Sequence, residues 1–271
     1  MELTSSIVSV DWLNANIELE HLIVLDASIP KAGDSINSSL SELQIPKSRF
    51  FDLKNKFSKQ DAKFPNTVPS AEQFQREARN LGINSNSLIV IYDNLGVYSS
   101  PRAWWLFKLM GFDAVAVLNG GLPAWNRAML RTEKRPLPRW HQGNFMSHVR
   151  PDLLTTFKMI QSRSNTIKMI DARSKDRFLG IGVEPREGLR CGSIPNSLNL
   201  PYSEILEGAS LLEIQSLKAI FSSIVKLEDK LVFSCGSGVT ACILALAADI
   251  SGYEYISVYD GSWTEWGSLT T

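Results

Sequence analysis

The chain repeats itself at a scale of about half its length, and this repeat constrains the fold more than any other feature. Four landmarks recur in the same order with similar gaps: an apolar run ending in Asp-Ala, an Ile-Pro-x-Ser tetrapeptide, an apolar run entering a glycine-containing loop, and an apolar run followed by glycine and tryptophan. The repetition predicts two homologous domains. The four pairs are residues 22–27 and 167–172, 45–48 and 194–197, 88–97 and 231–239, and 117–125 and 258–266.

Short apolar runs alternate with helix-like stretches within each half. The runs at residues 22–25, 88–92 and 114–118 have the length and continuity of strands buried on both faces, as parallel strands are. An apolar stretch between Pro101 and Gly111 is typical of a helix, and the stretch from Thr240 to Ile250 takes its place in the second half. The alternation predicts an α/β fold of two tandem domains, each a parallel sheet flanked by helices.

Domain boundaries follow from the repeat. We expect a first domain over residues 1–130, a linker over 131–152 and a second domain over 153–271. The linker contains three prolines and a basic cluster and lacks hydrophobic periodicity.

Charge and cysteine content limit the class of protein. Lys+Arg and Asp+Glu both number 28, so bulk charge does not favour a nucleic-acid or anionic-membrane partner. No apolar run approaches the roughly 18 residues of a membrane span, and the first ten residues do not read as a secretory signal. Three cysteines (Cys191, Cys235 and Cys242) are too few for a disulfide framework. We expect a cytoplasmic protein without nucleic-acid or membrane partners.

The segment Cys235–Thr240 joins a predicted strand to a predicted helix. Gly236 and Gly238 permit backbone conformations closed to other residues, so that consecutive N–H groups converge as an anion nest at a helix N-terminus. A cysteine in such a nest is expected to be largely thiolate near neutral pH. The same N–H groups would stabilise a persulfide or an anionic substrate. A buried structural cysteine is the commoner reading of an arbitrary cysteine, but the glycine pair and the helix start favour a reactive one.

Three other cysteine chemistries fit less well. Zinc is disfavoured because no Cys-x-x-Cys pair exists and the three histidines are scattered. A Cys-His protease is disfavoured because no histidine lies near the landmark loops. Cysteine phosphatases place an arginine six positions after the cysteine, and Ala241 stands there. We expect no metal and no cofactor, and we expect Cys191 and Cys242 to be structural or incidental.

Several segments, spread from about Val8 to Gly267, carry a more specific likeness: residues 50–53, 100–105, 171–174, 177–180, 184–186, 235–241 and 259–267. They resemble the tandem-domain rhodanese family and, within it, the 3-mercaptopyruvate sulfurtransferases. The thiosulfate branch of that family usually carries Cys-Arg-Lys-Gly in the loop. Gly236 and Ser237 instead follow the mercaptopyruvate pattern.

The resemblance implies a catalytic loop in the second domain and a cleft between the domains. Asp93 stands in the first domain where the second has Cys235. A carboxylate cannot carry sulfane sulfur, so the first domain is expected to be non-catalytic and to shape one wall of the cleft.

The activity implied is sulfur transfer in two steps. Cys235 would take sulfur from the small-molecule donor 3-mercaptopyruvate, release pyruvate and hold a persulfide. The persulfide would then pass its outer sulfur to cyanide or to a thiol such as thioredoxin. A monomer or weak oligomer is expected.

Residue roles carry over by position. Cys235 and Ser237 are the expected catalytic residues. Arg177 and Arg186 match the positions that bind the substrate carboxylate and carbonyl, which suits the two-point bonding of guanidinium; the plain alternative is a pair of solvated loop charges. The loop residues expected to bind substrate are Gly236, Gly238, Val239 and Thr240.

The chain departs from the family in its proton relay. The family usually has histidine before each Ile-Pro, and its mercaptopyruvate branch is proposed to relay protons through Ser, His and Asp. Gln44 and Ser193 stand at the histidine positions, and Asp34 lies near that of the aspartate. Glutamine cannot shuttle a proton at neutral pH. Three alternatives follow: water or Ser237 alone delivers the proton, turnover of mercaptopyruvate is slow, or the sulfur donor is a different molecule.

Two further readings stay open. One is a thiosulfate sulfurtransferase. The other is a sulfur-binding or regulatory module without turnover. The family's Ile-Pro-Gly also reads Ile-Pro-Lys47 and Ile-Pro-Asn196 here, which we interpret as divergence without loss of function.

Overall fold

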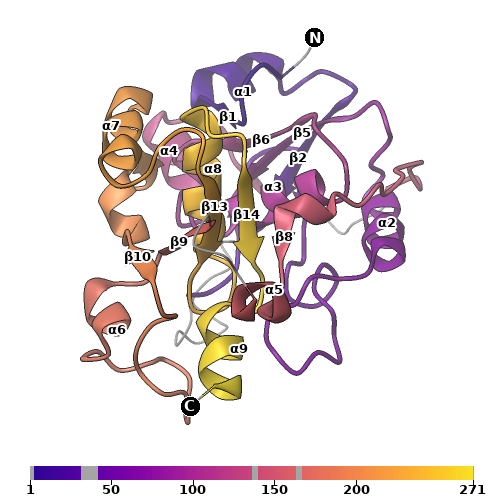
Figure 1. The fold of residues 1–271 in the computed structure, drawn as a ribbon. Helices are drawn as coiled ribbons and strands as arrows, with labels where there is room; N and C mark the ends of the chain where they lie inside the picture. Colours follow the sequence, from indigo (N-terminus) through magenta and orange to yellow (C-terminus); the bar gives the residue numbers. More distant parts are fainter. Residues whose placement is uncertain (1–2, 32–41, 136–139, 163–166, 271) are drawn as a thin grey trace. The chain divides into compact units, whose positions relative to one another are not determined.

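A computed structural model describes residues 3–31, 42–135, 140–162 and 167–270 (Figure 1). The chain forms two compact units, and each takes a short segment from the other half of the sequence. Residues 62–67 belong to the second unit, and residues 208–210 belong to the first. The first unit is otherwise built from residues up to Arg150 and the second from Pro151 onward.

The two units contain five-stranded sheets of the same topology. The strand order is β1-β6-β5-β2-β4 in the first unit and β8-β14-β13-β9-β10 in the second, and all neighbours are parallel. Each strand of the first sheet thus has a counterpart in the second, which confirms the predicted α/β fold of two tandem domains. The strands are β1 (Ile7–Val8), β2 (Leu22–Asp26), β4 (Arg49–Phe50), β5 (Leu88–Tyr92), β6 (Val115–Leu118), β8 (Leu154–Thr155), β9 (Ile167–Asp171), β10 (Ser197–Asn199), β13 (Lys230–Ser234) and β14 (Ile256–Tyr259).

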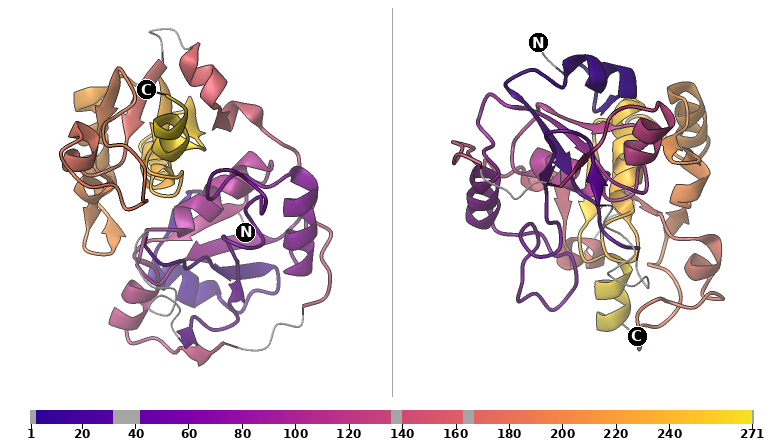
Figure 2. Two further views of the ribbon diagram at one scale, coloured as in Figure 1. Left: turned by 90° about the horizontal axis from the view of Figure 1, so that it is seen from below. Right: turned by 180° about the vertical axis from the view of Figure 1, so that it is seen from behind.

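Helices accompany both sheets (Figure 2). The two that follow the central strands, α3 and α8, are the most deeply buried: every residue of α8 from Ala241 to Ala248 is buried. A helix covered on all sides has no use for a polar face, which explains its continuous apolar sequence. The helices are α1 (Val10–Asn16), α2 (Ala71–Asn80), α3 (Ser100–Leu109), α4 (Gly121–Arg127), α5 (Phe157–Gln161), α6 (Lys175–Leu179), α7 (Ile214–Ile224), α8 (Ala241–Ile250) and α9 (Ser262–Leu269).

Smaller elements complete the two units. β3 and β7 pair antiparallel, and β11 and β12 form a second two-stranded sheet. The remaining elements are β3 (Leu43–Gln44), β7 (Glu133–Lys134), β11 (Leu206–Glu207), β12 (Ser210–Leu211) and the 3-10 helices η2 (Pro151–Leu153) and η3 (Tyr202–Ile205). Within the described ranges no helix is long and apolar enough to cross a membrane.

The three strands predicted in the first half form as expected. β2, β5 and β6 occupy the predicted runs to within one residue at each end, and every residue in them is buried. Continuous burial is what distinguishes parallel strands covered on both faces from the half-exposed strands of antiparallel sheets.

The segment predicted as a linker, residues 131–152, packs in large part on the first unit. The Phe145 ring is fully buried and contacts the rings of Phe74, Phe107 and Phe112. Its backbone N–H donates to the Ile83 carbonyl. Separate anchor points of this kind hold a segment without any periodic pattern, which is why the sequence reads as a linker. The boundaries at 130 and 153 stay predictions.

The two Ile-Pro landmarks form the same turn. Lys47 and Asn196 follow the prolines with φ of 64° and 57°, the left-handed region in which glycine is the usual residue. In both turns the following serine, Ser48 or Ser197, donates its hydroxyl to the carbonyl of the isoleucine. The backbone conformation is thus preserved although glycine is absent.

Candidate active site

Cys235 lies directly after β13, in the loop that enters α8. It is 2% exposed, and its Sγ accepts the N–H of Gly238 at 3.1 Å. Gly238 has φ of 78°, so the left-handed turn predicted for a glycine in this loop is present there. In the described part of the chain the N–H groups of Gly236, Ser237 and Val239 donate to no protein acceptor. These N–H groups can therefore bind an anion beside the sulfur.

Gly236 serves a different purpose from the one predicted. Its φ is not positive, so backbone freedom is not what the position requires. A Cβ on Gly236 would lie 3.0 Å from Nη2 of Arg177 and 3.7 Å from Nη1 of Arg186. The residue is small because two guanidinium groups come close to the loop. The two arginines predicted to bind substrate are thereby brought together at the Cys235 loop.

Hydrogen bonds from the N-terminus of α9 hold the backbone of the Cys235 loop. The N–H groups of Trp263 and Thr264 donate to the carbonyls of Cys235 and Gly236 at 2.9 Å each, and the Thr264 hydroxyl donates to the Gly236 carbonyl at 2.6 Å. Ser262 Oγ accepts the N–H of Cys235 at 3.1 Å. The sequence analysis assigned no role in the loop to Ser262 and Thr264, whose positions follow from the tertiary contact between β13 and β14.

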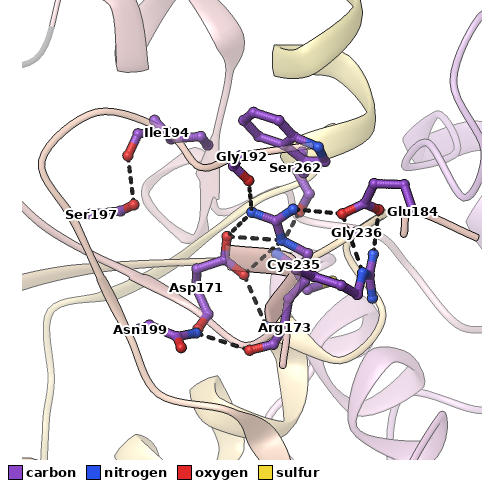
Figure 3. A network of polar contacts seen from close by, with 12 residues as sticks. Asp171, Arg173, Glu184, Gly192, Ile194, Ser197, Asn199, Cys235, Gly236 and Ser262 are labelled. Atoms are coloured by element: carbon purple, nitrogen blue, oxygen red, sulfur yellow. Dashed lines mark hydrogen bonds and ion pairs between the residues drawn. The ribbon is translucent and has the colours of Figure 1, made fainter. Parts of the chain in front are cut away.

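A buried ion network supports the arginines (Figure 3). Arg173 pairs with Asp171 at 2.6 Å and with Glu184 at 2.8 Å, and all three side chains are about 1% exposed. Burial by itself would lower the pKa of Arg173, but the hydrogen bonds and charges of Asp171 and Glu184 outweigh it, and the pKa is raised. Glu184 also pairs with Arg177 at 2.6 Å.

Ser237 receives two hydrogen bonds at its hydroxyl. Arg186 Nη2 and Asn66 Nδ2 both donate to Ser237 Oγ at 3.0 Å, and Asn66 also donates to the Ser237 carbonyl at 3.2 Å. Because the hydroxyl accepts both bonds, it keeps its own hydrogen for a third partner. Asn66 was not predicted as a site residue. It lies 171 positions from Ser237, in the segment 62–67 that joins the second unit, and no local motif signals that contact.

The predicted relay positions are described only in part. Gln44 is buried in the first unit, where its amide donates to the Ser48 carbonyl at 3.0 Å and to Glu133 at 3.3 Å. Asp34 lies outside the described residues. Among the described residues, Asn66 and Arg186 donate to the Ser237 hydroxyl.

The other predicted residues and cysteines have plain settings. Val239 is buried and Thr240 directly precedes α8. Cys242 is buried in α8 and donates to the Gly238 carbonyl, whereas Cys191 is exposed. None of the three cysteines forms a disulfide, and the described residues contain no cluster of His, Cys, Asp or Glu that could hold a metal ion.

Fold and site together define a class of protein: a duplicated α/β domain in which the second copy presents a buried thiol at the entrance of a helix, with guanidinium groups beside it. The profile of the rhodanese-like domain matches residues 9–128 and again residues 156–269. The chain belongs to the rhodanese-like family, as a tandem of two domains.

Its relatives cover nearly the whole chain. A thiosulfate/3-mercaptopyruvate sulfurtransferase 2 of Arabidopsis thaliana is 37% identical over 97% of this chain and 84% of the relative. The human 3-mercaptopyruvate sulfurtransferase is 35% identical over 98% and 93% of the two chains. The crystal structure of SseA from Escherichia coli, described as a 3-mercaptopyruvate sulfotransferase with the rhodanese fold, superposes with a TM-score of 0.84 at 30% identity, covering 96% of this chain and 99% of that one.

Proposed function

We propose that this protein transfers sulfur from 3-mercaptopyruvate to a thiol or to cyanide through a persulfide on Cys235. The observation that carries the proposal is the Cys235 loop, where the sulfur accepts the Gly238 N–H and two arginines lie against Gly236. The more general prediction, a sulfurtransferase of the rhodanese family, is confirmed by relatives of that activity that cover nearly the whole chain.

In the first step the Cys235 thiolate attacks the sulfur of 3-mercaptopyruvate. The new Sγ–S bond forms as the S–C3 bond of the donor breaks, and its electrons leave on the pyruvate enolate, which is then protonated. Arg177 and Arg186 bind the donor carboxylate and carbonyl, and their proximity to the loop supports this role. The unpaired loop N–H groups stabilise the charged outer sulfur.

In the second step an acceptor nucleophile attacks the outer sulfur. The S–S bond breaks and the Cys235 thiolate returns. Proteins of this family use small sulfur donors and acceptors; for this chain we propose a thiol such as thioredoxin, or cyanide. The first domain, with Asp93 in place of the cysteine, takes no sulfur. A cytoplasmic location and a monomeric or weakly oligomeric state stay predictions.

Ser237 is placed to handle the proton of the first step. Its hydroxyl accepts from Arg186 and Asn66, so its hydrogen is available to the departing enolate or to a water molecule. An asparagine amide holds that hydroxyl in position but cannot pass a proton on. Asn66→His would add a titratable group, and we expect pyruvate release to become faster and to acquire a pH dependence near the usual pKa of histidine.

Steady-state release of pyruvate and sulfide from 3-mercaptopyruvate with excess dithiol tests the function. Intact mass after donor treatment should rise by one sulfur atom in the wild type and stay unchanged in Cys235→Ser. Thiosulfate is the second candidate donor, since the Arabidopsis relative carries both names. A wide preference for thiosulfate would overturn the choice of donor, and the absence of turnover on both would indicate a sulfur-binding module.

A further inference from the structure

Glu184 joins two arginines that have different surroundings. Its Oε1 accepts from Arg173 Nη1 at 2.8 Å and from Arg177 Nε at 3.2 Å, and its Oε2 accepts from Arg177 Nη2 at 2.6 Å. The Glu184 side chain is 1% exposed, whereas that of Arg177 is 23% exposed. Glu184 is therefore the buried link between the interior and the arginine at the loop.

Arg173, the buried partner of Glu184, is held in place by contacts that do not involve Arg177 (Figure 3). Arg173 donates to both carboxylate oxygens of Asp171 and to the carbonyl of Gly192, and its guanidinium lies 4.7 Å from the centre of the Trp263 ring. A residue held from so many sides provides a rigid base for Glu184.

The outer end reaches the catalytic loop. The same Arg177 Nη2 that bonds to Glu184 lies 3.0 Å from the point where a Cβ of Gly236 would stand. Glu184 approaches Arg177 with both oxygens, a two-point contact that fixes the plane of the guanidinium as well as its position. The orientation of Arg177 beside the loop is thus determined by Glu184.

Glu184 also sets the charge at the loop. Three guanidinium groups, those of Arg173, Arg177 and Arg186, are joined by hydrogen bonds to this region, and two carboxylates, Asp171 and Glu184, face them. These five side chains leave one positive charge, which the Cys235 thiolate of the proposed mechanism offsets. Loss of the Glu184 charge would add one positive charge at the loop, and this would favour a dianion such as thiosulfate over a donor with one carboxylate.

We propose that Glu184 is a positioning and specificity-determining residue, which orients Arg177 toward the sulfur donor and holds the loop at the charge that favours a monoanion. The inference rests on the proposed function. Its first test is therefore independent of sulfur transfer.

Alkylation of Cys235 by anionic iodoacetate and by neutral iodoacetamide, followed by peptide mass spectrometry, reports the charge at the sulfur. We expect Glu184→Gln to raise the ratio of the two rates by about fivefold, the size of effect that one added charge has at a partly screened site. The exposed Cys191 is the internal control, with an unchanged ratio. The double variant Arg177→Met/Glu184→Gln removes one charge of each sign and should return the ratio to that of the wild type. An unchanged ratio in folded Glu184→Gln would overturn the proposal.

Donor kinetics give the second test. In Glu184→Gln the ratio of kcat/KM for thiosulfate to kcat/KM for 3-mercaptopyruvate should rise by about fivefold for the same reason. Failure of the wild type on both donors would reject the proposed function but leave the alkylation result standing.

Glu184→Asp keeps the charge and shortens the reach, and it covers the case in which Glu184→Gln does not fold because Arg173 loses a buried partner. We expect KM for 3-mercaptopyruvate to rise several-fold more than kcat falls, while the alkylation ratio stays within about twofold of the wild type. An unchanged KM would show that Glu184 does not position Arg177.

Discussion

The loops after β5 and β13 occupy equivalent positions in the two units and share one backbone conformation. They differ in the side chain that begins the loop and in what their backbone N–H groups bind. The first loop begins with Asp93 and the second with Cys235. Gly96 and Gly238, three positions further on, both have positive φ, at 110° and 78°. Each loop thus turns at a left-handed glycine before its helix.

The segments after β6 and β14 hold the two loops in the same way. The N–H of Leu122 donates to the Asp93 carbonyl at 3.0 Å, as that of Trp263 does to the Cys235 carbonyl at 2.9 Å. The residues before these donors, Gly121 and Ser262, have φ of 50° and 49°. The backbone that supports the Cys235 loop is therefore a property of the repeat, because the loop with Asp93 in place of the cysteine shares it.

The difference lies in what occupies the anion nest. Asp93 Oδ2 accepts three backbone N–H groups, from Tyr98, Ser99 and Ser100, together with the Ser100 hydroxyl, while Oδ1 accepts the N–H of Leu95. Burial raises the pKa of Asp93, and the hydrogen bonds from Ser100, Tyr98 and Leu95 act against that shift. In the first loop the Asp93 carboxylate occupies the backbone N–H donors. In the second loop the Cys235 sulfur accepts one N–H, and the other N–H groups remain open to a ligand.

The largest expected effect on activity comes from replacing the thiol of Cys235. Cys235→Ser should reduce sulfur transfer at least about a thousandfold, because a serine oxygen cannot form a persulfide. Pyruvate release with excess dithiol measures it. Cys191→Ser, at an exposed thiol outside the loop, is the matched control and should keep its activity. Comparable turnover in the two variants would contradict the assignment of Cys235.

The next largest effect is on stability and concerns the Asp93 carboxylate, which accepts the N–H groups of the first loop. Asp93→Asn replaces an acceptor oxygen by an NH₂ group that faces N–H donors. We expect the free energy of unfolding to fall by about 3 kcal/mol, from the unsatisfied buried groups. Urea denaturation measures it. A change below about 0.5 kcal/mol would show that the carboxylate does not hold the loop together.

A smaller effect distinguishes the roles of the two glycines in the Cys235 loop. Gly236→Ala places a methyl group against Arg177 without backbone strain, and Asn94 stands at the equivalent position of the first loop. We expect KM for 3-mercaptopyruvate to rise about tenfold with little loss of stability. Gly238→Ala, at φ of 78°, should instead lower the free energy of unfolding by about 1–2 kcal/mol. A loss of stability in Gly236→Ala together with a raised KM in Gly238→Ala would contradict the proposed role of Gly236.

The smallest effect compares the two Ile-Pro turns. Lys47→Gly relieves a left-handed lysine and should raise the free energy of unfolding by about 0.5–1 kcal/mol. Asn196→Gly should change it by less than about 0.5 kcal/mol, because asparagine tolerates this conformation. Thermal unfolding of the paired variants measures both. Equal gains would mean that the residue type does not matter at this turn.

Parts of the fold and site were predictable because their signals are local. The strands Leu22–Asp26 and Leu88–Tyr92 are recognisable from continuous apolar sequence, and the Cys235 loop from a glycine between a strand and a helix. Alignment of the repeated landmarks also predicted that Asp93 and Cys235 occupy equivalent positions.

Other parts have no local signal. The segment 140–150 carries no periodic pattern, yet it packs on the first unit through the buried Phe145 ring, the Arg150–Asp113 ion pair and scattered hydrogen bonds. The contact of Gln44 with Glu133 likewise has no local signal, because Glu133 lies 89 positions away in the sequence.

The sequence by itself determined that this protein is a duplicated α/β chain of the rhodanese-like family with one thiol-bearing loop and one carboxylate-bearing loop, because strand periodicity, glycine positions and repeated motifs act over a few residues. Only the tertiary structure decided that Asn66 contacts Ser237 and that Glu184 lies between Arg173 and Arg177. The first contact joins residues 171 positions apart, and the second depends on how a loop folds back over a buried ion pair. Contacts of this kind arise from packing of the whole unit, which no short stretch of sequence encodes.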